Sequence, residues 1–128
     1  MDPSVRQDFP SGCRLRDSRD FERAFGSGLR ASDEHLLIFA SPNGIQQTRF
    51  GLSVSRKHGG AVQRNRKKRL LREAVRACRG GLPPGLDLVL VPRQRSDSSL
   101  RDFCASLPAL VRRLVRRIPV RNEVPGSG

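Results

Sequence analysis

The chain has 128 residues, and its 25 Lys and Arg against 12 Asp and Glu give a formal net charge of +13. This length suits one domain, and such a cationic excess is typical of a protein that binds a polyanion. Three widely spaced cysteines argue against a disulfide framework or a zinc knuckle. No segment approaches the ~18 apolar residues of a membrane span or resembles a signal peptide, so a soluble, cytoplasmic protein is expected.

The N-terminal part of the sequence predicts an arm followed by a short helix. Residues 1–12 hold two prolines and a glycine with little periodicity, so we expect a flexible arm ahead of a single domain at residues 13–118. A helix is predicted to begin near Ser18, whose side chain can cap it. This helix places Phe21 and Phe25 four residues apart on one face.

Two strands are predicted next. Residues 36–41 form an apolar run that a Pro-Asn-Gly turn signal follows. Residues 50–55 alternate large apolar residues with small or polar ones, which is the pattern of a half-buried strand. The small residues of this second strand are Gly51, Ser53 and Ser55. They are expected to leave room for a binding partner on that face of the sheet.

The strongest helix signal covers residues 61–79. One arc of its helical wheel is apolar and consists of Leu70, Leu71, Ala74, Val75 and Cys78. The opposite arc is polar and consists of Asn65, Lys68, Arg69, Arg72, Arg76 and Arg79. Lys67 falls on the apolar arc near the helix start, from where its long side chain is expected to reach past the end of the core.

The last third of the sequence predicts one strand and one helix. The near-continuous apolar run at residues 87–91 is typical of a central strand. Residues 98–118 have helical periodicity, which Pro108 is expected to kink or divide, and residues 119–128 predict a disordered tail. The order helix, strand, strand, helix, strand, helix indicates an α/β sandwich with helices packed on a small mixed sheet.

The densest positive charge lies between residues 56 and 76. This segment contains nine Lys or Arg residues and a single acid, Glu73. A solvated helix face usually alternates charge signs, whereas these like charges repel one another at successive turns. Because guanidinium groups match phosphate oxygens, the segment predicts binding to a nucleic-acid backbone that weakens steeply with salt.

Other candidate residues indicate binding rather than catalysis. Phe21, Phe25 and Phe39 could stack on unpaired bases or belong to the core, and the sequence leaves both possibilities open. His35 and His58 have no partners at metal-ligand spacing, and no nucleophile with its base is visible. The residues alone therefore describe a binding protein without catalytic residues or a metal site.

Residues 51–73, with the sequence GLSVSRKHGGAVQRNRKKRLLRE, closely resemble the signature of the bacterial ribonuclease P protein component. In that signature a strand ends in Ser-(Lys/Arg)-Lys, and a Gly turn leads through Ala-Val to Arg-Asn-Arg and a Lys-Arg pair on a helix. The resemblance extends over about residues 14–114. It includes the first helix with its two phenylalanines and the strand that ends at Arg93.

The resemblance implies an enzyme subunit without catalytic side chains. Such proteins bind a large catalytic RNA, which hydrolyses the phosphodiester bond with its own Mg²⁺ ions, and they help it to remove the 5′ leader from precursor tRNA. The implied partners are the catalytic RNA, with one protein per RNA, and precursor tRNA. No membrane is involved, and no cofactor is expected on the protein itself.

The resemblance also implies two binding surfaces. The catalytic RNA would be bound by Arg64, Asn65, Arg66, Lys68, Arg69, Arg72 and Arg76. The leader cleft would be formed by Phe21, Phe25, Phe39, Ser53, Ser55, Arg56 and Lys57. Phe39 stands where the family often has Tyr, and His58 replaces an aliphatic residue, so these departures bear on leader preference.

For the fold, the resemblance implies an α+β two-layer sandwich of order αβββαβα, with a mixed four-stranded sheet and three helices. The second domain of a small-subunit ribosomal protein is similar, and the strand–helix–strand crossover is implied to be left-handed, against the usual rule.

Three alternative functions stay open. A ribosomal protein shares this architecture, a membrane-active protein fits only the charge, and a DNA-binding protein would need a dimer seam or helix-turn-helix spacing that is not evident.

Overall fold

The computed structural model describes residues 13–118, and the arm and tail predicted at 1–12 and 119–128 lie outside the described residues. The helices and strands in chain order are α2 (Ser18–Gly26), β1 (Leu29–Ser32), β2 (Leu36–Pro42), β3 (Arg49–Leu52), α3 (Ala61–Cys78), β4 (Leu86–Pro92) and α4 (Leu100–Arg117). Two short 3-10 turns are η2 (Arg56–His58) and η3 (Arg79–Gly81). The order αβββαβα agrees with the resemblance, whereas the residue pattern alone missed β1 because four residues are too few to show an alternation.

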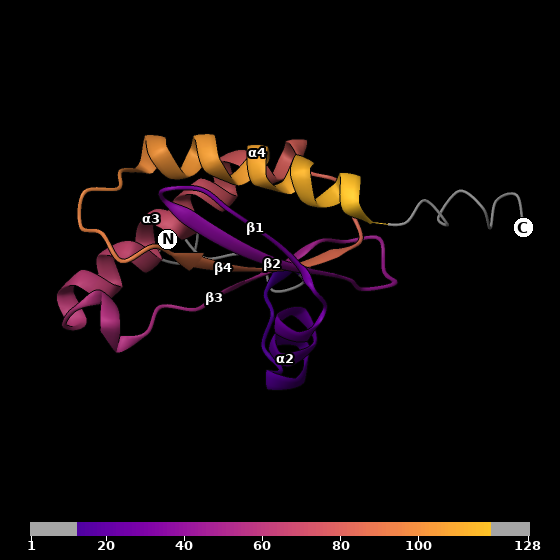
Figure 1. Cartoon of the computed structure of the whole chain (residues 1–128), viewed down its shortest axis with the longest axis horizontal. Coiled ribbons are helices and arrows are strands. Elements are labelled where there is room, and N and C mark those ends of the chain that lie inside the picture. Colours follow the sequence, from indigo (N-terminus) through magenta and orange to yellow (C-terminus); the bar gives the residue numbers. More distant parts are fainter. Residues whose placement is uncertain (1–12, 119–128) are drawn as a thin grey trace, which may run out of the picture.

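The four strands form one mixed sheet in the order β1-β2-β4-β3. β2 lies antiparallel to both β1 and β4, whereas β3 lies parallel to β4. β3 and β4 are joined through α3, so this connection is the crossover that the resemblance implies to be left-handed. α3 and α4 cover one face of the sheet, and α2 lies against the other (Figure 1). The α+β sandwich with a mixed sheet and three helices is therefore confirmed.

β4 is the central strand and is buried on both faces, which explains its nearly unbroken apolar sequence. On the face toward α3 and α4, Leu88 packs with Ile38 of β2, and both are fully buried. On the face toward α2, Val89 packs with Ala24 in a second, smaller cluster. One strand thus supplies side chains to both apolar clusters.

β3 is shorter than predicted. It ends at Leu52, although the Ser53 N–H still donates to the Leu90 carbonyl at 3.0 Å. Ser55 lies beyond the strand, where its hydroxyl accepts the N–H of Lys57 at 3.4 Å and caps η2. The prediction of a strand through residue 55 is therefore wrong, because this serine serves the turn and not the face of the sheet.

Gly51 does not leave an open place on the sheet, contrary to the prediction. It is buried, and a Cβ at this position would come within 2.5 Å of the Phe21 ring and 3.1 Å of Leu15. The missing side chain therefore lets α2 pack closely on β3. The space that was expected to be open to a binding partner is filled at this point by the ring of Phe21.

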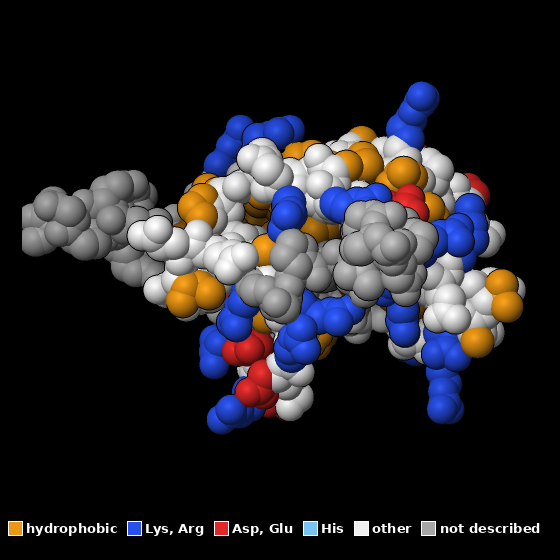
Figure 2. Space-filling model, turned by 180° about the vertical axis from the view of Figure 1, so that it is seen from behind, with side chains coloured by type: hydrophobic (Ala, Val, Ile, Leu, Met, Phe, Trp, Pro, Cys, Tyr) orange, Lys and Arg blue, Asp and Glu red, His pale blue; other side chains and the backbone are white. Residues whose placement is uncertain are grey.

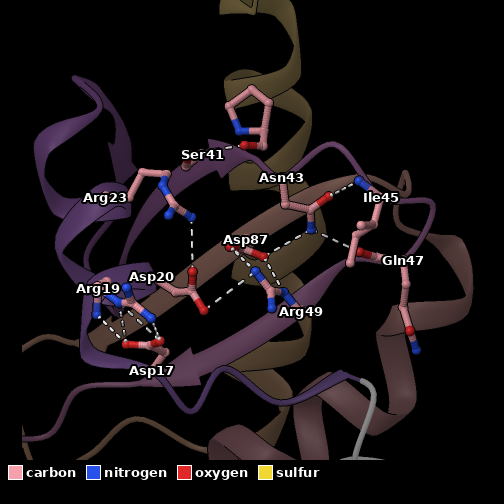
Figure 3. A network of polar contacts seen from close by, with 11 residues as sticks. Asp17, Arg19, Asp20, Arg23, Ser41, Asn43, Ile45, Gln47, Arg49 and Asp87 are labelled. Carbon is pink, nitrogen blue, oxygen red and sulfur yellow. Dashed lines mark hydrogen bonds and ion pairs between the residues drawn. The ribbon is translucent and has the colours of Figure 1, made fainter.

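A network of polar side chains ties α2 to the sheet (Figure 3). Asp87 of β4 is 1% exposed, and its carboxylate accepts hydrogen bonds from Arg49 at 2.8 and 2.7 Å and from Asn43 at 2.9 Å. The Arg49 guanidinium also lies 3.6 Å from Asp20 of α2, which pairs with Arg23 at 2.9 Å. A buried carboxylate needs such partners, so this network fixes β3, β4 and α2 relative to one another.

Two helix predictions are corrected at single residues. α2 is capped by Asp17, whose carboxylate accepts a backbone hydrogen bond in the first turn, and not by Ser18. α4 is not divided at Pro108, although this residue lacks the N–H that would bond to the Cys104 carbonyl. The Cys78 thiol of α3 donates to that carbonyl at 3.6 Å, so a neighbouring helix supplies the partner that proline cannot.

A buried lysine fixes the start of α3. Lys67 is 7% exposed, and its Nζ lies 2.9 Å from His58 Nδ1 and donates to the Arg93 carbonyl at 3.2 Å. The side chain turns inward between η2 and the end of β4, so the prediction that it reaches past the core is wrong. Burial and the nearby Lys67 ammonium lower the pKa of His58, which favours the neutral ring that accepts this hydrogen bond.

We predict that mild acid weakens the fold at this contact. Protonation of His58 in the native state would remove the acceptor for Lys67, so the unfolded chain takes up this proton first. The stability that the pair contributes is fully present above the ordinary histidine pKa of 6.5 and is lost as the pH falls through the lower native value. Urea unfolding at about pH 7.5 and about pH 5 measures this loss.

The matched variant is His58→Asn, which keeps an acceptor but does not titrate. We expect this variant to lose less unfolding free energy than the wild type over the same pH interval. Equal losses in the two proteins would contradict the assignment of the pH dependence to His58.

Candidate nucleic-acid interface

The cationic arc predicted on α3 faces away from the core. We call Arg64, Asn65, Arg66, Lys68, Arg69, Arg72 and Arg76 the α3 stripe. Arg66 and Arg69 are exposed and Lys68 is half-buried. Within residues 13–118, no ion pair joins any of these three side chains to an acid. Their charge is therefore not neutralised by the described part of the protein.

The distribution of charge over the surface agrees with this. Figure 2 shows Lys and Arg side chains around much of the visible face, while most of the acidic side chains on that face gather at α2. Two of the acids near α2, Asp17 and Asp20, pair with arginines at 2.8 and 2.9 Å. These two acids therefore lie on α2 and not on α3, where Glu73 is the one acid.

The turn before α3 positions the first arginine of the stripe. Gly59 has a φ of +111°, in the region that favours glycine, and a side chain there would meet Gln63. This conformation directs the Gly59 carbonyl toward Arg64, whose Nε donates to it at 3.2 Å. The glycine turn thus orients a guanidinium at the start of the helix.

A hollow of about 890 Å³ lies beside the stripe, and we call it the α3 hollow. One wall consists of η2 and the first two turns of α3, including Lys57 and Arg66. The other wall is the loop from β4 to α4, including Arg95 and Asp97. Segments about thirty residues apart in the sequence therefore form one concave surface.

The α3 hollow is positively charged. Asp97 is the one acid among the residues that line it, and its carboxylate accepts hydrogen bonds from Arg95 at 2.7 and 3.0 Å. These bonds lower the pKa of Asp97 to about 2, so it stays ionised and its charge is balanced by Arg95. Lys57 and Arg66 have no acid partner within residues 13–118, so they give the hollow its net charge.

The structure regroups one residue, Lys57, that the resemblance assigned to the leader cleft. Lys57 lines the α3 hollow together with Arg66 of the stripe. Arg56 and Ser55 are exposed on the same turn, and Ser53 is half-buried directly after β3. This turn therefore connects the sheet beneath α2 to the α3 stripe.

The three candidate phenylalanines lie between α2 and the sheet. Phe25 is 42% exposed, and its ring meets that of Phe39 edge-on, with the centroids 4.9 Å apart and the planes at 78°. Phe21 and Phe39 are half-buried and pack on the cluster of Ala24 and Val89. Phe21 therefore serves the packing of α2, whereas Phe25 remains accessible, and base stacking on its ring stays a prediction.

Sequence reasoning missed three residues at these surfaces. Arg30 is exposed and lies directly opposite Phe39 in the antiparallel pair of β1 and β2, so both side chains are on the α2 face. Arg95 reaches the α3 hollow from an irregular loop, and no local sequence pattern predicts this position. A signal did exist for Lys67, since a lysine on an apolar arc needs a buried partner.

Within residues 13–118, no group of three or more His, Cys, Asp or Glu could hold a metal ion, and the three cysteines are free. No helix in the same range combines the length and apolar character needed to cross a membrane.

Comparison with known proteins identifies the family. A family model described as Ribonuclease P matches residues 9–116. The ribonuclease P protein component of Desulfovibrio desulfuricans is 37% identical over 122 residues, which cover 91% of this chain and 94% of that protein. The corresponding protein of Thermotoga petrophila is 36% identical over 105 residues, covering 80% of this chain and 90% of that protein.

Solved structures agree with the sequence comparison. The RNase P protein of Thermotoga maritima matches with a TM-score of 0.71 at 33% identity, over 78% of this chain and 96% of that one. The RNase P protein of Staphylococcus aureus matches with a TM-score of 0.69 at 26% identity, over 83% and 96% of the two chains. Since the family model spans most of the sequence and relatives above 30% identity cover most of its length, the chain belongs to the ribonuclease P protein component family.

Proposed function

We propose that this chain holds two RNAs at once: the α3 stripe binds the catalytic RNA, and the α2 side of the sheet, where the Phe25 ring is accessible, holds the 5′ leader of precursor tRNA. As a member of its family, the chain is the protein subunit of the endoribonuclease that processes the 5′ leader of tRNA, and it partners an RNA subunit. The observation that carries the proposal is that Arg66, Lys68 and Arg69 of α3 have no acid partner in residues 13–118.

RNA phosphates suit the α3 stripe for a physical reason. Arginine offers planar donor forks that match phosphate oxygens, and each neutralised phosphate releases condensed counterions. The α3 hollow adds Lys57 beside Arg66, and Gly60 leaves the first turn of the helix without a side-chain cap. Uncapped N–H groups at a helix start favour an anion, so this end of α3 is suited to hold a phosphate.

The leader is assigned to the α2 side of the sheet. A base stacked on an aromatic ring is stabilised by about 1–3 kcal/mol, and the exposed Phe25 ring beside Phe39 is the best-placed platform. Phe21 and Phe39 pack against the same small apolar cluster. Arg30 beside Phe39, and Arg56 on the turn that leads to α3, would contact the leader backbone.

Bond cleavage is assigned to the catalytic RNA and its Mg²⁺ ions, and no catalytic side chain or cofactor is assigned to the protein. The protein contributes by binding the leader and the catalytic RNA in a fixed relation, which positions the scissile bond. One protein per RNA is expected. A cytoplasmic location is expected as well, since the three free cysteines suit a reducing compartment.

Reconstitution with a bacterial ribonuclease P RNA at low Mg²⁺ tests this function. Adding the protein should speed leader removal from precursor tRNA by about tenfold or more, because one stacked base alone is worth about 1–3 kcal/mol and 1.4 kcal/mol is tenfold. Single-turnover cleavage with and without protein is the measurement. Equal rates in a buffer where the RNA is shown to be folded would defeat the proposal.

Substitutions should separate the two surfaces. Arg66→Gln combined with Arg69→Gln should weaken binding to the catalytic RNA, whether or not tRNA is present, while the matching Arg→Lys pair keeps the charge and most of the affinity. Phe25→Ala should leave that binding unchanged and lower the preference for precursor over mature tRNA by about tenfold. Binding titrations with both tRNAs provide the measurement.

Ile45→Ala is the matched control for Phe25→Ala, because Ile45 is 47% exposed and lies outside both surfaces. This control should bind precursor and mature tRNA as the wild type does. If Phe25→Ala weakened both tRNAs equally, the leader would have to be assigned elsewhere on the protein.

A further inference from the structure

The C-terminal half of α4 carries a second group of cations that the proposed function does not use. Arg112, Arg113, Arg116 and Arg117 occupy two adjacent turns, and all four are exposed. In the described range 13–118, no ion pair joins any of them to an acid. Like charges three and four residues apart on a helix repel one another, so this arrangement calls for an explanation.

Two of these arginines are held against the edge of the sheet. β1 is an edge strand, so its outer carbonyls have no neighbouring strand to pair with. Arg113 donates to the Ser32 carbonyl at 3.2 Å, and Arg117 donates to the carbonyls of Gly28, at 3.2 Å, and Arg30. Carbonyls are neutral, so these contacts fix the guanidinium groups in place without cancelling their charge.

Structural roles account for part of the group only. The helix dipole favours cations in the last turn of α4, which includes Arg116 and Arg117. The edge of β1 explains Arg113 and Arg117. Neither reason applies to Arg112, which lies before the last turn and, within the described residues, forms no hydrogen bond with β1.

This part of α4 lies away from the leader cleft and from the start of the α3 stripe. α4 covers the sheet face opposite α2, so a strand bound beside α2 does not reach the outer side of α4 without passing around the sheet (Figure 1). The beginning of α3 and the end of α4 also lie toward opposite ends of the long axis (Figure 1). A partner on these arginines therefore extends beyond the leader cleft and the start of the α3 stripe.

We propose that Arg112, Arg113, Arg116 and Arg117, the α4 patch, bind the phosphate backbone of a further RNA segment. All four cations are arginines, whose forks suit phosphate oxygens, and backbone contacts position an RNA without depending on its base sequence. The proposal rests on the proposed function, which supplies the RNA partners. The segment belongs either to the catalytic RNA or to the body of the tRNA, which share this phosphodiester chemistry.

The test uses the full chain with Arg112→Gln and Arg116→Gln, which leave the contacts of Arg113 and Arg117 with β1 in place. Affinity is measured over a range of salt concentrations in two arms, for the catalytic RNA and, with the holoenzyme, for mature tRNA without a leader. Loss of two phosphate contacts should lower the log–log salt slope by about 1.5 in one arm or both. The control pair Arg112→Lys and Arg116→Lys should keep the wild-type slope.

The arm that changes identifies the RNA that supplies the segment. Unchanged affinity and salt slope in both arms would overturn the α4 patch, as would an equal loss in the Lys pair, which retains both charges. Arg112→Gln alone, which lies outside the last turn, should give about half the slope change. Its unfolding midpoint should equal that of the wild type, which excludes a folding defect as the cause. In each of these cases the wild-type protein would still speed leader removal in the reconstitution test. Failure of the α4 patch is therefore distinguishable from failure of the proposed function.

Discussion

Carboxylates in the described part of the chain take part in structural contacts, and Arg66, Lys68 and Arg69 of α3 have no acid partner there. Asp87 is balanced by Arg49 within the sheet, Asp97 is balanced by Arg95, and Asp102 completes the cap of α4. Removing one partner of the buried Arg49–Asp87 pair typically costs about 3–5 kcal/mol, so Asp87 is not available to a surface cation. With a net charge of +13, the remaining repulsion is relieved by a polyanionic partner.

Strand β3 links the two proposed surfaces. Gly51 of β3 lets Phe21 pack closely, which places α2 and the accessible Phe25 over the sheet. Two residues later the chain leaves β3 for the turn that ends at Gly59 and orients Arg64. Because buried side chains and hydrogen bonds fix each step, the distance from the leader cleft to the catalytic-RNA surface is set by the fold and not by a flexible linker.

Strong local periodicity explains what could be predicted from the sequence. α3 and β4 were found because eighteen residues with an apolar arc, and a buried central strand, leave a clear pattern. The rest depends on contacts between distant residues. No local pattern shows that Phe21 fills the space over Gly51, that Lys67 turns inward to His58, or that Arg95 closes the α3 hollow. The stripe itself was predictable, whereas its relation to the hollow was not, and neither were the hydrogen bonds from arginines of α4 to the edge of β1.

The salt dependence of RNA binding by the wild-type protein tests the central claim most directly. The dissociation constant for ribonuclease P RNA is measured at constant Mg²⁺ while the monovalent salt concentration is varied over about a decade. If phosphates neutralise the α3 stripe, log Kd should rise linearly with log salt with a slope of about 3 or more, which corresponds to at least about four phosphate contacts. A slope near zero would contradict the account, because it would mean that the cations of α3 do not contact the RNA backbone.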